Sequence, residues 1–406
     1  MEESRRMRYN HDTEARMFIF KLAFRNILGA GLRTWLNVVA LSFSFVAIIF
    51  LQGIYTGMND QVEQATVDAF YGGGQFWQRS YDPYDPLTLD DAHALLPKEL
   101  NALVQSDQAT PILIRQAAIY PEGRFRTILL KGIDPLQKVL SVPSILLMDG
   151  QGTIPALIGS RMAKSTGLHK GDELTIQWRD VHGTFDARTV RIIAVVKTSV
   201  QEIDNGQVWI PLDQLQSLSA MPGHATIVVL RPSISPPGIS SGWEFKSLEY
   251  LLQDIHTAVR SKRISASIFY IVLLFLAMLA IFDTQVLSIF RRRKEMGTLM
   301  ALGMTRANII ELFTLEGALH GIFAAFVAAL YGIPLLGYVA KTGWELPGAA
   351  DAVGFAIGEK LFPTYSVALV AGTTALVLLV TTVVSFLPTR RIAKLKPTDA
   401  LRGKMS

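Results

Sequence analysis

The side chains best suited to catalysis or metal binding are seven histidines, and they are scattered along the chain. They are His11, His93, His169, His182, His224, His256 and His320. They show no paired metal-ligand spacing, and the sequence contains neither H-E-x-x-H nor G-x-S-x-G. It also lacks the phosphate-binding motif G-x-x-x-x-G-K-[ST]. We therefore expect a non-catalytic chain that binds no metal or cofactor itself.

Four ionisable residues, one of them a histidine already named, lie at the edges of long apolar segments: Asp283, Glu311, Glu316 and His320. Charges inside a bilayer are costly and often functional. A basic cluster at residues 291–294 lies nearby in the sequence. The spacing therefore predicts that these groups are hydrated or paired with this cluster, and a proton relay is the alternative.

The composition indicates a membrane protein. Half of the 406 residues are apolar and 18% are charged, and the apolar residues form separate blocks. A hydrocarbon layer of about 30 Å requires roughly 20 apolar residues. The first candidate span could also be a signal peptide, but its apolar run is too long and no small-residue cleavage site follows. Four stretches qualify as spans, at residues 36–54, 265–282, 317–340 and 365–389.

Basic residues flanking the spans predict the orientation, because Lys and Arg accumulate on the cytoplasmic side. We expect both termini to be cytoplasmic and residues 58–262 to lie outside. The net charge of +5 is explained by these flanks, so nucleic acid is not an expected partner. The flanking residues are Arg16, Lys21, Arg25 and Arg33, then Arg291, Arg292, Arg293, Lys294 and Arg306, then Arg390, Arg391, Lys394 and Lys396.

The external segment has the pattern of an α+β domain. It contains no cysteine, so its own core must hold it together. A turn at 180–183 and a linker at 231–242 are expected from their residue types. Strands are predicted at 111–120, 125–133, 173–179, 184–197, 207–212 and 225–231, and helices at 87–103, 158–166 and 212–218.

Two helical features are expected beside the membrane. Residues 17–32 interleave Phe, Leu and Ile with Lys21 and Arg25, a pattern suited to an amphipathic helix lying in the headgroup region. Residues 244–290 contain neither Gly nor Pro, so one helix of roughly 70 Å is predicted. Its outer part would form a stalk paired with residues 55–70, acting either as a lever or as a simple tether. The stalk residues at helical spacing are Leu248, Leu251, Leu252, Ile255 and Val259.

Small residues also recur at a spacing of four in the spans. Gly53 with Gly57, and Gly317 with Gly321, form pairs that would permit close helix approach.

The segment 291–317 lies between the second and third spans. Met296, Leu299, Met300 and Gly303 follow helical spacing. Gly303 can supply the left-handed residue that ends this short helix, and Thr305 can cap the next one. Such a helix suits docking into a partner's groove, and a snorkelling juxtamembrane turn is the alternative.

The same segment resembles the signature of FtsX/MacB-like ABC transporter permeases, in which a basic cluster, E-x-G and A-x-G form the helix that engages the ATPase. Residues 388–401 resemble the family's tail, and the beginning of the chain resembles its elbow and anchor. Residues 130–137, 157–177 and 202–218 are similar to the MacB-like periplasmic domain of lipoprotein-releasing (LolC/LolE-like) permeases. The matching signature residues are Arg293, Glu295, Gly297, Ala301 and Gly303.

The resemblance implies an α-helical membrane protein with four transmembrane helices and a large α+β extracytoplasmic domain between spans 1 and 2. The segments would be 1–57 (elbow and first span), 58–262 (MacB-like domain and stalk) and 263–406 (FtsX-like domain). The site implied for ATPase coupling is Arg293, Glu295, Met296, Gly297, Leu299, Met300, Ala301 and Gly303.

The implied function is that of a permease in the bacterial inner membrane. Its expected partners are cytoplasmic ABC-type ATPases, which would bind ATP and Mg, a second permease chain, identical or related, and membrane lipids. Mechanotransmission would drive release of a lipoprotein substrate. The alternatives are an FtsX-type regulator that activates wall hydrolases and a receptor that only senses ligand.

Overall fold

The computed structural model describes residues 17–29, 31–150, 152–196, 206–239, 242–345 and 360–392. The chain divides into two compact units. We call Met1–Gly57, Ser261–Trp344 and Phe362–Ser406 the helical unit, and Met58–Arg260 with Glu345–Leu361 the sheet unit. The first and third segments expected from the sequence thus share one unit. Residues 202–205 and 240–241, and the tail after residue 392, lie outside the described residues.

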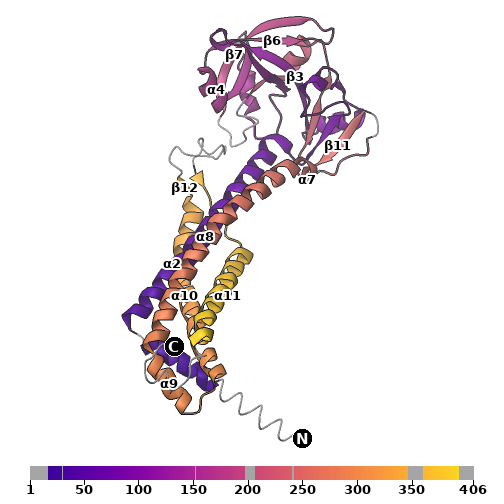
Figure 1. Cartoon of the computed structure of the whole chain (residues 1–406). Coiled ribbons are helices and arrows are strands. Elements are labelled where there is room, and N and C mark those ends of the chain that lie inside the picture. Colours follow the sequence, from indigo (N-terminus) through magenta and orange to yellow (C-terminus); the bar gives the residue numbers. More distant parts are fainter. Residues whose placement is uncertain are drawn as a thin grey trace. The chain divides into compact units, whose positions relative to one another are not determined.

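The sheet unit is built on nine strands in the order β11-β1-β10-β3-β4-β8-β5-β7-β6. An additional pairing of β6 with β3 closes six of them into a barrel, and β3, β6 and β7 are labelled together in Figure 1. The pairs β4–β8 and β5–β7 are parallel. The nine strands are β1 Gly74–Gln78, β3 Ala109–Ile119, β4 Arg126–Ile133, β5 Ile154–Gly159, β6 Glu173–Arg179, β7 Phe185–Val196, β8 Gln207–Pro211, β10 Ile227–Leu230 and β11 Trp243–Ser247.

Short elements complete this unit. A π-helix, Val67–Tyr71, follows α2 (Leu32–Thr66), and the small strands β2 and β9 pair with each other. The short elements are β2 Ala94–Leu95, β9 His224–Ala225, α3 Lys98–Gln105, α4 Ser160–Thr166, α6 Leu212–Leu218, α7 Leu248–Leu251 and the 3-10 helices Pro86–Asp90, Pro121–Gly123 and Ser144–Met148.

The barrel interior is filled by alternate residues of its strands, as a closed sheet requires. On β6, Leu174, Ile176 and Trp178 are buried while their neighbours point outward. The indole N–H of Trp178 donates to the carbonyl of Leu218 at 3.1 Å. The end of α6 is thereby fixed to the barrel, and Leu215 of α6 is fully buried.

Most predicted strands are confirmed, and two expected helices are wrong in part. The strand 173–179 and the helix 212–218 have the predicted bounds. The region 87–103 instead forms a 3-10 helix, a short strand and α3, because Pro97 can precede a helix but not continue through one. Residues 158–159 belong to β5, whose unbroken apolar run is typical of a buried strand.

The helix expected over 244–290 begins later than predicted. Residues 243–247 form β11, which pairs with β1 along its whole length, because its alternating residues place Trp243 in the core and leave Glu244 exposed. The chain then forms α7, turns at Leu252 and continues as α8, Gln253–Arg291. The proposed stalk is therefore irregular at Leu252, although the N–H of Leu252 still donates to the carbonyl of Leu248 at 3.0 Å and its carbonyl accepts from His256 at 2.8 Å.

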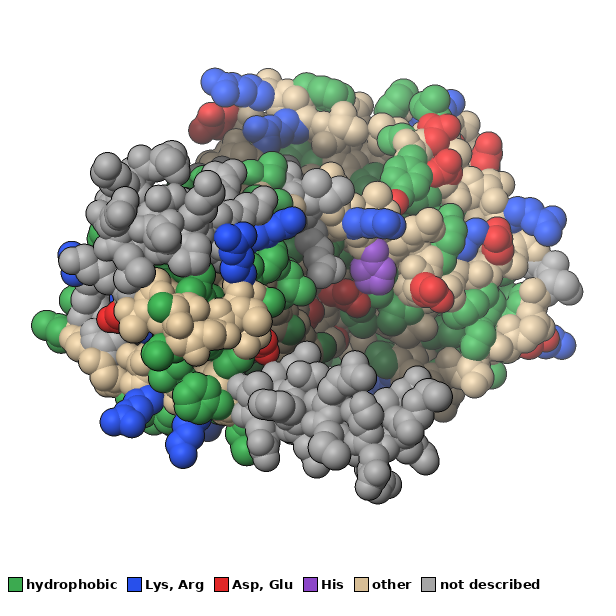
Figure 2. Space-filling model, turned by 60° about the horizontal axis from the view of Figure 1, so that its bottom comes forward, with side chains coloured by type: hydrophobic (Ala, Val, Ile, Leu, Met, Phe, Trp, Pro, Cys, Tyr) green, Lys and Arg blue, Asp and Glu red, His purple; other side chains and the backbone are tan. Residues whose placement is uncertain are grey.

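The helical unit contains the apolar helices. Among the described residues, three are long and apolar enough to cross a membrane: Trp35–Tyr71, Arg306–Thr342 and Val367–Arg390. The second predicted span falls within α8, where the apolar stretch Ser267–Leu276 is shorter than these three helices. Hydrophobic side chains (green) reach the surface beside Lys and Arg (blue) on the face drawn in Figure 2. The helices that lie wholly or mostly in this unit are residues 17–29, α2 Leu32–Thr66, α8, α9 Arg293–Ala301, α10 Arg306–Thr342 and α11 Val367–Ile392.

Glycines allow close packing in the helical unit: Gly321 permits the predicted close helix approach, whereas Gly53 and Gly57 lie against a segment that is not helical. A Cβ on Gly321 would lie 2.8 Å from the hydroxyl oxygen of Thr381. A Cβ on Gly53 would collide with the Tyr365 ring, and one on Gly57 with the Phe362 carbonyl. These contacts bring α2 against the segment before α11, and α10 against α11.

A candidate coupling site on the helical unit

The candidate docking helix α9 has well-defined ends. Gly303 has φ +99° and follows the last turn. The N–H of Gly303 donates to the carbonyl of Met300 at 3.1 Å, and that of Met304 to Leu299 at 3.0 Å. These two bonds form a Schellman motif. The Thr305 hydroxyl caps α10 by accepting from the N–H of Asn308, so both predicted helix signals are confirmed.

The apolar face of α9, which was expected to dock into a partner's groove, is packed inside the chain. Met296 is only 2% exposed and lies in a cluster with Ile19, Ala23 and Phe313. Leu299 and Met300 are half-buried against the same cluster. One face of the elbow helix, residues 17–29, is apolar, and this face is buried by packing against α9 and α10.

The most exposed apolar side chain beside α9 lies at its C-terminal end. Leu302 is 79% exposed. Glu295, Ala301 and Gly303 are also exposed, whereas Gly297 is buried. The side chain of Arg293 lies outside the described residues. The predicted site residues thus divide into a buried set that anchors α9 and an exposed set that a partner can reach.

Arg292, directly before α9, is the centre of a polar network. Its Nη1 donates to both carboxylate oxygens of Glu316, at 2.8 and 3.0 Å, and its Nε donates to Glu295 at 2.7 Å. Asn26 of the elbow helix donates to Glu316 at 2.7 Å. The Arg292 guanidinium also lies 4.9 Å from the centre of the Phe313 ring. The network joins the elbow helix, the start of α9 and α10.

Glu316 is 5% exposed, and a buried carboxylate needs such partners. The pairing predicted between Glu316 and the basic cluster is therefore confirmed. His320, one turn further along α10, has its Nδ1 2.6 Å from the Glu316 carbonyl. Asp283 and Glu311 are exposed. Asn26 was missed because nothing in the sequence indicates that the elbow helix packs against α10.

The predicted stalk residues lie on α7, its following turn and α8. Leu251 and Leu252 are buried, while Leu248, Ile255 and Val259 are half-buried. Across the described ranges, no group of three or more metal-ligating side chains is placed to hold a metal ion.

The long apolar helices, the α9 site and the barrel domain define a membrane protein with a large folded domain. Two family matches identify its class. Residues 34–241 match the MacB-like periplasmic core domain, and residues 267–397 match the FtsX-like permease C-terminal domain. The chain belongs to the family of FtsX/MacB-like permeases, the membrane subunits of ABC transporters.

Individual relatives agree with this family. A "Lipoprotein-releasing system transmembrane protein LolC" of Xylella fastidiosa is 21% identical over 98% of this chain and 97% of its own length. The protein of the same name from Neisseria meningitidis is 22% identical over 72% of this chain and 77% of its own length. An "Uncharacterized ABC transporter permease" of Methanocaldococcus jannaschii is 29% identical over 126 residues, which make up 30% of this chain and 28% of that relative.

Among solved structures, the chain matches the extracellular domain of the noncanonic ABC-type transporter YknZ from Gram-positive bacteria. The identity is 16%, and the match covers 45% of this chain and 94% of that one, with a TM-score of 0.26.

Proposed function

We propose that this permease couples ATP hydrolysis by a separate cytoplasmic ATPase to movement of its extracytoplasmic domain. The observation that carries the proposal is the network of Arg292, Glu316 and Asn26. A partner that displaces α9 would pull on α10 and the elbow helix together, because packed elements transmit displacement. Leu302, at the exposed end of α9, is the proposed contact with the ATPase.

The proposal includes four spans, with α8 as the second and both termini cytoplasmic. Within α8, Ile268, Phe269 and Ile271 are at least half exposed. Large apolar side chains in such a row favour contact with lipid or with the helix of a second permease chain. Reporter fusions at Gly183 and Ser406 would test the topology, with an exterior signal expected from the first and a cytoplasmic signal from the second.

The proposed substrate is a lipoprotein, because the relatives matched over most of the chain are named for lipoprotein release. The test is depletion of the chain in its host, followed by fractionation of lipidated proteins. Accumulation of lipoproteins in the inner membrane is expected. Normal lipoprotein distribution together with impaired wall hydrolysis would instead assign the chain to the regulatory type.

A further inference from the structure

A rigid loop of the sheet unit presents three large apolar side chains to solvent. Ile145, Leu146 and Met148 belong to the 3-10 helix Ser144–Met148 and are between 45% and 61% exposed. Leu147, between them, is 2% exposed and packs in the core. The buried residue therefore fixes the turn while its neighbours remain uncovered.

The loop is held in place by the side chain of Gln137. Its Oε1 accepts from the N–H groups of Val139 and Leu140, both at 2.8 Å. Its Nε2 donates to the carbonyl of Leu140 at 3.0 Å and to the hydroxyl of Ser144 at 3.1 Å. Ser144 in turn donates to the carbonyl of Pro135 at 3.2 Å. The exposed apolar side chains are thus preorganised, which lowers the entropic cost of binding.

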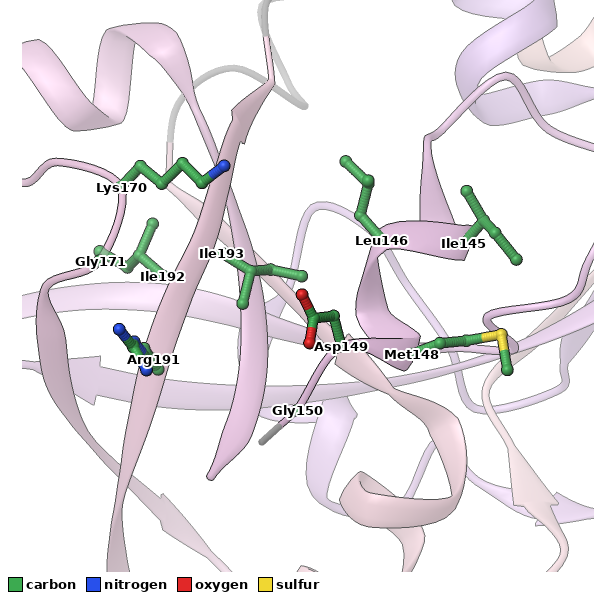
Figure 3. Close-up of a pocket in the computed structure, with 10 residues that line it drawn as sticks. All are labelled: Ile145, Leu146, Met148, Asp149, Gly150, Lys170, Gly171, Arg191, Ile192 and Ile193. Carbon is green, nitrogen blue, oxygen red and sulfur yellow. The ribbon is translucent and has the colours of Figure 1, made fainter. Parts of the chain in front are cut away.

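These side chains form one wall of a cavity of about 500 Å³. Figure 3 shows the 3-10 helix on one side and Lys170 and Arg191 on the other, with Asp149 between them. Within the described part of the chain, neither Lys170 nor Arg191 forms an ion pair. The lining therefore combines an apolar wall with an excess of positive charge.

We propose that this cavity binds a short peptide segment of an extracytoplasmic protein, in which a large apolar side chain lies next to a carboxylate. Its volume suits a few side chains, as in the anchor pockets of protein interfaces. The apolar residue would pack on Leu146 and Met148, and the carboxylate would pair with Lys170 or Arg191. A lipid surface fits less well, because the apolar residues line a hollow that also contains the Asp149 carboxylate. This inference rests on the proposed topology, which the reporter fusions test separately, and not on the substrate of the transporter.

The test uses the full chain in phosphatidylcholine nanodiscs, panned against displayed random 12-residue peptides. We expect enrichment of peptides with Leu, Ile, Met or Phe beside Asp or Glu. A labelled peptide from this set should bind at least about tenfold more weakly to Leu146→Asp and to the double variant Lys170→Glu/Arg191→Glu. The double variant Lys98→Glu/Arg124→Glu, which reverses two exposed charges elsewhere in the sheet unit, should bind as the wild type does.

Three outcomes would overturn the proposal. They are no enriched motif, equal binding by all variants, and displacement of the peptide by phosphatidylglycerol vesicles, which would assign the cavity to a lipid surface. The altered side chains are exposed, so circular dichroism of each variant should match that of the wild type.

Discussion

At the scale of single residues, Arg292 and Leu302 have different tasks. Arg292 contacts α9 through Glu295 and α10 through Glu316 and Phe313. Leu302 lies at the end of the same short helix and is left to solvent. One residue fixes the helix and the other is available to a partner, so substitutions of the two should have separable effects.

Replacing Leu302 should weaken ATPase binding without harming the fold. We expect Leu302→Asp to raise the dissociation constant for the ATPase at least about tenfold, because a charge would replace an apolar anchor at an interface. Leu87→Asp, at a similarly exposed leucine of the sheet unit, is the matched control. Biolayer interferometry on the purified chain would measure both, and equal affinities would remove Leu302 from the interface.

Removing Glu316 should destabilise the protein. Glu316→Ala leaves Arg292 without its buried partner, and breaking such a pair costs about 3–5 kcal/mol. Glu295→Ala removes a more exposed partner of the same arginine, at a cost of about 0–1 kcal/mol. Thermal unfolding of the two variants should therefore differ clearly, and similar midpoints would show that the buried pair is not the stronger contact.

The stability of the β2–β9 pair should depend on pH. The Nδ1 atoms of His93 and His224 lie 2.9 Å apart, and burial, followed by the charge of His224, lowers the pKa of His93. The folded chain therefore holds His93 neutral, whereas the unfolded chain takes up a proton below about pH 6.5. Stability should be full above that value and decrease as the pH falls below it.

Hydrogen exchange at β2 and β9, corrected for intrinsic rates, would measure this dependence between pH 7.5 and 5.5. His93→Gln should reduce it, and His182→Gln, at an exposed histidine, should not. An unchanged pH dependence in His93→Gln would exclude this histidine as the cause.

At the scale of elements, the sequence predicted those features that hydrogen bonds between nearby residues determine. The end of α9 and the cap of α10 follow from Gly303 and Thr305, whose bonds lie within a few residues. β11 could not be predicted in this way, because its partner β1 lies far away in the sequence. The burial of Met296 was missed for the same reason, since the elbow helix that covers it is distant in the chain.

The glycine contacts of the helical unit give a prediction at this scale. Gly57→Ala would place a methyl group against the backbone of Phe362, and such overpacking typically costs about 1–3 kcal/mol. Gly372→Ala, on α11 with open space around it, should be neutral or slightly stabilising. Thermal unfolding of both variants tests this, and equal stabilities would show that the packing around Gly57 can relax.

At the scale of the whole molecule, the proposed function makes the protein a transmitter of movement. The chain lacks the motif that would bind ATP phosphates, and it belongs to a permease family. On the proposed function, energy would enter through a partner at α9 and act on the extracytoplasmic domain. A proline meant to interrupt the lever belongs well inside α8, at Val259, because the helix is already irregular at Leu252.

Movement of the sheet unit upon nucleotide binding is the central claim, and spin-label distances measure it directly. The sequence has no cysteine, so Leu87→Cys and Leu330→Cys, both at exposed positions of different units, can be labelled selectively. In the permease–ATPase complex in nanodiscs, the account predicts that ATP and Mg shift the distance distribution. It also predicts that Val259→Pro keeps ATP hydrolysis but loses the shift. Identical distributions with and without nucleotide in the wild-type complex would contradict the account.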